Sequence, residues 1–182
     1  MSDVTELDVL RDVTARLTGN GIDYMLTGSF AMNYYAQPRM TRDIDIVVAL
    51  KSSDVDQISE IFAEDYYVSQ EAIEDAIRNQ TVFNLAHYES LVKIDMIIRK
   101  REEYRKLEFD RRTLVKIADF NVWIVGKEDL ILSKLNWAKE SKSEMQIRDV
   151  KNLISTPVDH EYLSRWAPEL GVQDLLKECL NE

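Results

Sequence analysis

The sequence predicts an α+β protein with a mixed β-sheet flanked by helices in its N-terminal two thirds and a helical C-terminal part. Up to about residue 126, short β-type apolar runs alternate with segments of helical periodicity. From Lys127 onward, every segment has a helical pattern. We therefore expect a core over residues 1–126 and a helical part over residues 127–182 that packs on this core.

The individual elements follow from periodicity and from residues that stop or start a helix. Helical spacing predicts helices over residues 5–18, 29–37, 53–63 and 71–79, and about four more after residue 127. Apolar runs predict strands over residues 22–28, 43–50, 81–89 and 91–99, and a hairpin over 113–126 that turns at Ala118–Asp119. Gly19 and Gly21 end the first helix, Ser29 is placed to cap the second, and Pro38 ends it.

Composition excludes several classes of protein. The net charge of −10 over 182 residues argues against a general nucleic-acid-coating protein, although it leaves room for a local basic groove. No apolar run approaches the roughly 18–20 residues of a membrane span, and we expect no membrane partner. The single Cys179 excludes an intrachain disulfide. We expect a soluble cytoplasmic protein.

Three aspartates carry the strongest chemical signal. Asp43 and Asp45 share one face of the strand predicted at 43–50, because alternate residues of a strand point the same way. Asp95 interrupts a later apolar strand and joins them if the two strands are neighbours. Three carboxylates on one face predict a divalent cation, Mg²⁺ or Mn²⁺, since Mg²⁺ binds carboxylates together with substrate phosphates. The alternative is that Asp43 and Asp45 lie on the solvent-exposed face of an edge strand and bind nothing.

A Gly-Ser pair precedes the acidic residues. Gly28 lies where a strand ends and Ser29 where a helix begins, a geometry that offers backbone N–H groups and a hydroxyl to an anion. Alternatively, Gly28 serves a tight turn and Ser29 only caps the helix. Beside the aspartates, a phosphate is the favoured ligand.

Lys134 lies within an apolar face. On a helical wheel of residues 127–139, Leu130, Ile131, Leu135, Trp137 and Ala138 form one arc with Lys134 near its middle. A buried ammonium needs an anion, either a carboxylate or a phosphate, unless the side chain snorkels to water. Asp149 borders the apolar stripe of the next helix, where it orients Lys134 or forms an ordinary salt bridge, and Arg148 falls on the polar face.

The segment from Arg99 to Lys116 is locally basic in an acidic chain. Two interpretations remain open for it. It holds a nucleic-acid backbone near the metal site, or its interleaved acidic residues make it a solvated helical face.

Together these residues resemble the nucleotidyltransferase superfamily. Gly28-Ser29, then Asp43-x-Asp45 with Arg42 directly before it, then Asp95, follow its pattern. The segments "YMLTGSFAMNYYAQPRMTRDIDIVV" and "KEDLILSKLNWAKES", with the later pair Arg148-Asp149, are similar to AbiEii-like (type IV toxin) and related small bacterial nucleotidyltransferase-like proteins. The resemblance covers roughly residues 20–155.

The resemblance implies a nucleotidyltransferase-type mixed sheet and an enzyme that transfers an NMP from an NTP to an acceptor hydroxyl. It implies catalytic roles for Asp43, Asp45, Asp95 and Lys134, with the three aspartates as metal ligands. The residues it implies for nucleotide binding are Gly28, Ser29, Arg42, Lys134, Arg148 and Asp149. The acceptor (tRNA, another RNA, a protein, or a small molecule such as an aminoglycoside) stays open, although the acidic surface slightly favours a small molecule over a large RNA. A cognate antitoxin is a further expected partner. The alternative is a catalytically inert member of the fold that binds a nucleotide or a partner protein.

Overall fold

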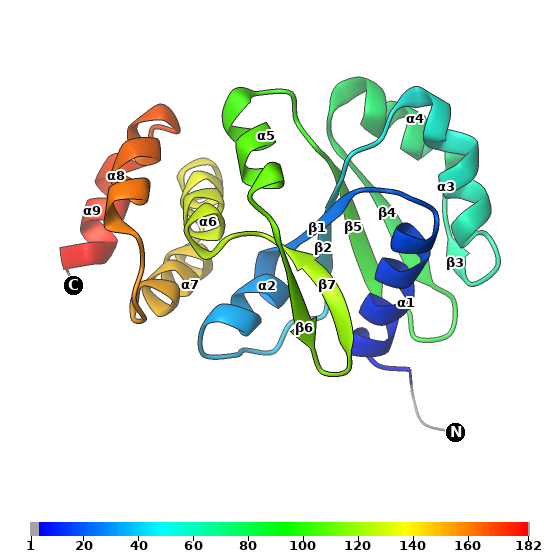
Figure 1. Ribbon diagram of the computed structural model, residues 1–182, viewed down its shortest axis with the longest axis horizontal. Coiled ribbons are helices and arrows are strands. Elements are labelled where there is room, and N and C mark those ends of the chain that lie inside the picture. The colour runs from blue at the N-terminus through cyan, green and yellow to red at the C-terminus, as the bar shows by residue number, and fades with distance from the viewer. Residues whose placement is uncertain (1–3, 182) are drawn as a thin grey trace.

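The computed structural model describes residues 4–181, and its helices and strands alternate through most of the chain (Figure 1). The helices are α1 (Glu6–Gly19), α2 (Gly28–Tyr35), η1 (Ser52–Asp54, a 3₁₀ turn), α3 (Val55–Phe62), α4 (Gln70–Asn79), α5 (Glu103–Asp110), α6 (Lys127–Ser141), α7 (Glu144–Ile154), α8 (His160–Glu169) and α9 (Gln173–Asn181). The strands are β1 (Tyr24–Thr27), β2 (Ile44–Val48), β3 (Tyr66–Tyr67), β4 (Val82–His87), β5 (Lys93–Ile98), β6 (Thr113–Ile117) and β7 (Phe120–Ile124).

The strands form one mixed sheet in the order β3-β4-β5-β2-β1-β7-β6. The pairs β2–β5 and β1–β7 are parallel, and the other neighbouring strands are antiparallel. The predicted α+β class with a mixed sheet and a helical C-terminal part is therefore confirmed.

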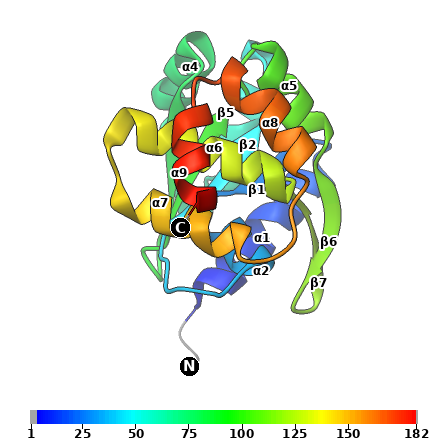
Figure 2. The same cartoon turned by 90° about the vertical axis from the view of Figure 1, so that its left-hand side faces the viewer.

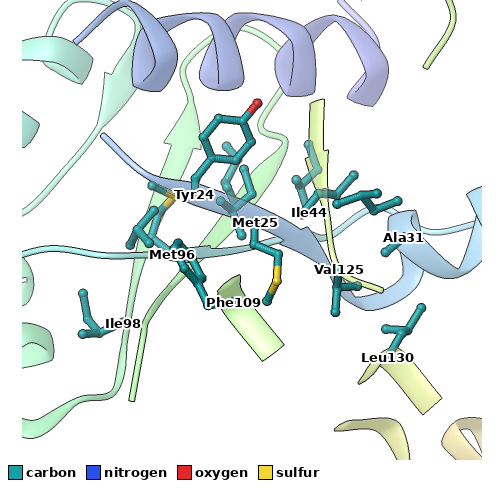
Figure 3. Packing of buried hydrophobic residues seen from close by; sticks show 14 of the residues in the cluster. Tyr24, Met25, Ala31, Ile44, Met96, Ile98, Phe109, Val125 and Leu130 are labelled. Carbon is teal, nitrogen blue, oxygen red and sulfur yellow. The ribbon is translucent and has the colours of Figure 1, made fainter. Parts of the chain in front are cut away.

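The two faces of the sheet have different roles. Ile44, Ile46 and Met96 are fully buried on the face that α1, α3 and α4 cover. Figure 3 shows Tyr24 and Met25, successive residues of β1, pointing to opposite sides of the strand. The face of Met25 continues into β2 and β5 with polar residues instead of a closed core, and the candidate site forms there.

Most of the predicted elements are present, and the differences have local causes. Strand β3 was missed because two residues carry no periodicity. The helix expected to start at Ser53 begins with the 3₁₀ turn η1, in which the Asp54 carboxylate accepts a hydrogen bond from the backbone N–H of Lys51. Ala118 turns the β6–β7 hairpin with a φ of 51°, as expected from its position.

The C-terminal helices lie together on one side of the molecule, where α6 and α7 stand between α2 and the pair α8–α9 (Figure 1; Figure 2 looks onto this group). Asp129 on α6 is completely buried. Its carboxylate accepts hydrogen bonds from the Tyr104 hydroxyl (3.0 Å), Arg111 Nε (3.0 Å) and the Tyr162 hydroxyl (2.6 Å). This carboxylate therefore joins α5, α6 and α8.

A membrane-spanning helix is absent from residues 4–181, since none of the helices described there is long and apolar enough.

Candidate active site

Asp45 and Asp95 lie side by side on the open face of the sheet. Strands β2 and β5 pair in parallel with Asp45 opposite Asp95, while Ile44 and Ile94 form the neighbouring pair. The isoleucines are buried in the core, so alternation turns both carboxylates to the other face. Asp43, just before β2, lines the same cavity.

The environment of Asp45 disfavours its charge. Burial and the nearby Asp95, with a smaller contribution from Asp43, raise the pKa of Asp45 from 3.8 to about 6, although Lys134 opposes the shift. The carboxylates are thus close enough to repel each other.

Asp95 is held by its neighbours on the sheet. Asn84 Nδ2 on β4 donates to Asp95 Oδ1 at 2.5 Å, and Lys93 Nζ lies 3.1 Å from the same oxygen. Asp95 Oδ2 accepts no hydrogen bond from the residues at 4–181. One oxygen of Asp95, a residue that lines the cavity, is therefore held by two protein donors, and the other has no donor among the described residues.

The turn between β1 and α2 packs directly against Asp45. Gly28 has a φ of +65°, and a Cβ atom at this position would lie 2.0 Å from Asp45 Oδ2. Only glycine satisfies both the backbone angle and the close approach.

The expected capping role of Ser29 is wrong. Thr27 occupies the N-cap position and makes no side-chain capping bond, and α2 begins at Gly28, which has a positive φ. The Ser29 hydroxyl instead accepts a hydrogen bond from Arg39 Nη2 at 2.7 Å. Ser29 lines the same cavity as the acidic row formed by Asp43, Asp45 and Asp95.

A buried carboxylate joins two cations beside Ser29. Asp149 on α7 accepts two hydrogen bonds from Arg39, from Nε and Nη2, both at 2.8 Å. Lys134 Nζ donates to Asp149 Oδ2 at 2.7 Å and to Gln146 Oε1 at 3.0 Å. Lys134 is 4% exposed, which excludes a snorkelling side chain and confirms the prediction that it meets an anion.

The pKa values of Lys134 and Asp149 reflect a cluster in which two cations share one carboxylate. Burial acts to raise the pKa of Asp149, but hydrogen bonds from Arg39 and Lys134 outweigh it and hold the pKa below its usual range. Burial lowers the pKa of Lys134, and the charge of Arg39 adds to this effect, so that the contact with Asp149 compensates it only in part. One carboxylate thus faces two cations, and the cluster presents positive charge to the Ser29 end of the cavity.

The cavity has a volume of about 670 Å³ and contains most of the residues predicted from the sequence. Gly28, Ser29, Asp43, Asp45, Asp95 and Lys134 line it. Three residues predicted to bind the nucleotide do not line it: Asp149, which is buried, and Arg42 and Arg148, which are exposed. Arg148 lies 3.9 Å from Glu144 on its own helix. Trp137, expected within the apolar arc, is 54% exposed, because this part of α6 borders the cavity instead of the core.

Sequence reasoning missed Arg39 and a second polar cluster on the cavity wall. Arg105 Nη1 donates to Ser133 Oγ at 2.6 Å and to Glu108 Oε2 at 2.8 Å, and Ser133 donates to Glu108 Oε1 at 2.5 Å. Burial raises the pKa of Glu108 against the effect of Arg105. The only sequence signal for this cluster was that Glu108 and Arg105 are one helical turn apart.

The acidic residues suit a hard divalent cation in their chemistry. Asp45 and Asp95 are neighbouring oxygen donors whose mutual repulsion a cation relieves, and Mg²⁺ needs only one or two protein carboxylates besides phosphate oxygens and waters. No group of three or more Asp, Glu, His or Cys side chains is assembled as a metal site among residues 4–181. The residues therefore fit a cation that substrate oxygens help to bind.

Comparison with solved structures places this architecture among known folds. The chain is similar to an antigenic nucleotidyltransferase-like protein from Paracoccidioides brasiliensis (18% identity over 97% of this chain and 92% of that chain, TM-score 0.59). It is also similar to the lincosamide antibiotic adenylyltransferase LnuA, solved with lincomycin bound (16% identity, 85% and 99% covered, TM-score 0.57). The third is the antibiotic-resistance factor ANT(2'')-Ia (13% identity, 97% of each chain covered, TM-score 0.61).

No protein-family model matches the sequence, and no curated protein matches it either. The likeness to the three solved structures extends over most of each chain, with the mixed sheet and helices in a common arrangement. The chain has the fold of the nucleotidyltransferases.

Proposed function

We propose that this chain is a nucleotidyltransferase that moves an NMP from an NTP to an acceptor hydroxyl and releases pyrophosphate. The observation that carries the proposal is the Asp45–Asp95 pair on one sheet face, inside a cavity that Ser29 and Lys134 also line. A carboxylate pair beside an anion-binding end suits a phosphorylated substrate. Nucleotidyltransferases of the same fold support the assignment.

In the proposed reaction, the acceptor oxygen forms a bond to the α-phosphorus as the bond from that phosphorus to the leaving pyrophosphate oxygen breaks. The hydroxyl proton passes to Asp95 Oδ2, the oxygen without a protein donor among the described residues. Lys134 and Arg39, at the Ser29 end, stabilise the negative charge of the leaving pyrophosphate.

Asp43, Asp45 and Asp95 would hold Mg²⁺ or Mn²⁺, which when bound offsets the charge of the carboxylates and the triphosphate. Gly28 leaves room for the Asp45 carboxylate at the turn before α2. Asp149 positions Lys134 and Arg39 and makes no contact with substrate in this proposal.

We place the reaction in the cytoplasm, where NTPs are available. The AbiEii-like subtype and an antitoxin partner follow only from the resemblance of the sequence and stay predictions.

The test is incubation with each α-labelled NTP and Mg²⁺, followed by separate analysis of cell RNA, protein and metabolites for label. We expect label in one fraction, and its loss in Asp43→Asn and Asp45→Asn, which keep the side-chain shape but remove the charge. Both variants should melt as cooperatively as the wild type. Transfer at the wild-type rate by either variant would contradict the site.

The alternative is a catalytically inert member of the fold that binds a nucleotide or a partner protein. Such a protein would bind an NTP in the labelling experiment and yet leave no label on any fraction.

A further inference from the structure

The cavity continues well past the acidic row. Asp95, Ile97 and Arg99 alternate along β5 and its extension, so their side chains share the open face, and Val47 lies beside Ile97. Four residues of strand span about 13 Å. The floor of the cavity thus runs from carboxylates through two half-buried apolar residues to Arg99 and Lys100.

The cations at this far end differ from those at the Ser29 end. Arg39 and Lys134 share Asp149, and Arg105 is paired with Glu108. Arg99 and Lys100 form no ion pair with any residue of the described range 4–181; the Arg99 guanidinium lies 5.2 Å from the Phe109 ring. In a chain with a net charge of −10, two cations without carboxylate partners at the end of a cavity indicate an anionic ligand.

The opposite wall supplies an aromatic surface. Trp137 on α6 and Met145 on α7 both line the cavity, and they are 54% and 52% exposed. An exposed indole ring in the same cavity as two unpaired cations suits single-stranded nucleic acid, because bases stack on such a ring and phosphates contact the cations. Glu140 is the one carboxylate of this wall, among the described residues, that lacks an ion pair.

On the basis of the nucleotidyltransferase function proposed above, we propose that the acceptor is the end of a single-stranded nucleic acid. Its terminal hydroxyl lies at the acidic row, a base near the end stacks on Trp137, and a backbone phosphate contacts Arg99 and Lys100. The terminal hydroxyl loses its proton, its oxygen bonds to the α-phosphorus of the NTP, and pyrophosphate leaves. A polycationic acceptor, such as an aminoglycoside, would be repelled by the same two cations.

The experiment has two arms. The first measures binding of a non-hydrolysable ATP analogue with Mg²⁺ by calorimetry, which tests the nucleotide site alone. The second measures anisotropy of a short fluorescent single-stranded RNA of mixed sequence with that analogue present, for wild type, Arg99→Gln, Lys100→Gln and Trp137→Ala. Lys177→Gln, an exposed change of equal charge outside the cavity, is the matched control.

We expect each charge variant to weaken RNA binding several-fold and to reduce the salt slope of log K by about 0.7, the value for one phosphate contact on a single strand. Trp137→Ala should weaken RNA binding by about tenfold, as loss of a stacked base does. Lys177→Gln should bind like the wild type. All variants should bind the ATP analogue normally, which also shows that they are folded.

Unchanged RNA affinity in all three variants, with analogue binding intact, would overturn the acceptor assignment and leave the nucleotidyltransferase function standing. Competition by AMP as strong as that by RNA would overturn it too, in favour of a small acceptor. If the wild type binds no ATP analogue, the function proposed for the whole site fails instead.

Discussion

Folding favours the protonated form of the Asp45 side chain, compared with the unfolded chain. Because the pKa of Asp45 is about 6 in the folded state and 3.8 ordinarily, the folded chain binds more protons than the unfolded chain between these values. Stability therefore falls as pH rises from about 4 to about 6 and then levels off, as far as this group is concerned. With metal chelated, Asp45→Asn should be more stable than the wild type at pH 7, by about 3 kcal/mol for this pKa difference.

Urea unfolding of both proteins from pH 4.5 to 8 in EDTA measures this difference. The difference in the free energy of unfolding between the two proteins should grow as pH rises, and it should shrink when Mg²⁺ and an NTP are added. A difference that stays constant across this pH range would mean that Asp45 titrates normally in the folded protein.

Lys134→Met should separate catalysis from stability. Loss of a cation that stabilises developing charge lowers turnover by roughly two orders of magnitude. The melting temperature should change little, because Arg39 still forms two hydrogen bonds to Asp149. Lys139→Met, an exposed position on the same helix, serves as control; equal turnover in the two variants would make Lys134 purely structural.

Individual site residues differed in how well the sequence revealed them. Asp45, Asp95 and Lys134 were found because each interrupts an apolar pattern within its own element. Arg39 was missed because its partner Asp149 is 110 residues away and no local pattern marks the pair. Arg42 and Arg148, which came from the resemblance alone, lie outside the cavity lining.

At the scale of elements, the β1–α2 turn predicts a matched pair of glycine variants. Gly21 and Gly28 both have positive φ, but a Cβ at Gly21 meets nothing within 4 Å, whereas one at Gly28 meets Asp45. Gly21→Ala should cost about 1–2 kcal/mol for backbone strain alone. Gly28→Ala should cost clearly more, because Asp45 must also move.

Urea unfolding at pH 7 measures both glycine variants, and ATP-analogue binding by Gly28→Ala should be weakened as well. Equal destabilisation by the two changes would mean that Asp45 moves aside without a cost in stability, and that the turn does not fix the position of its carboxylate.

Element types were predictable from periodicity, while their ends depended on details that periodicity does not contain. The cap of α2 is an example, since the left-handed backbone of Gly28 decides which residue begins the helix. The exposure of Trp137 depends on where α6 leaves the core and borders the cavity, which only the packed structure determines.

At the scale of the whole molecule, the buried Asp129 predicts one cooperative unfolding transition. Its bonds to Tyr104 and Tyr162 connect α6 with α5 and α8, across the boundary proposed at residue 126. Tryptophan fluorescence and far-ultraviolet circular dichroism should therefore give the same urea midpoint. Asp129→Asn should lower both midpoints together, and two separate transitions would instead identify residues 127–182 as an independent unit.

The pairing of Asp45 with Asp95 also has a consequence for folding fidelity. A slip of one residue between β2 and β5 moves every side chain of the slipped strand to the opposite face. An isoleucine would then enter the cavity, and a carboxylate would enter the apolar layer beneath α1, where an unpaired charge is strongly unfavourable. The aspartates therefore act against misregistered chains, so that the residues proposed for catalysis also help to ensure that only correctly paired molecules are stable.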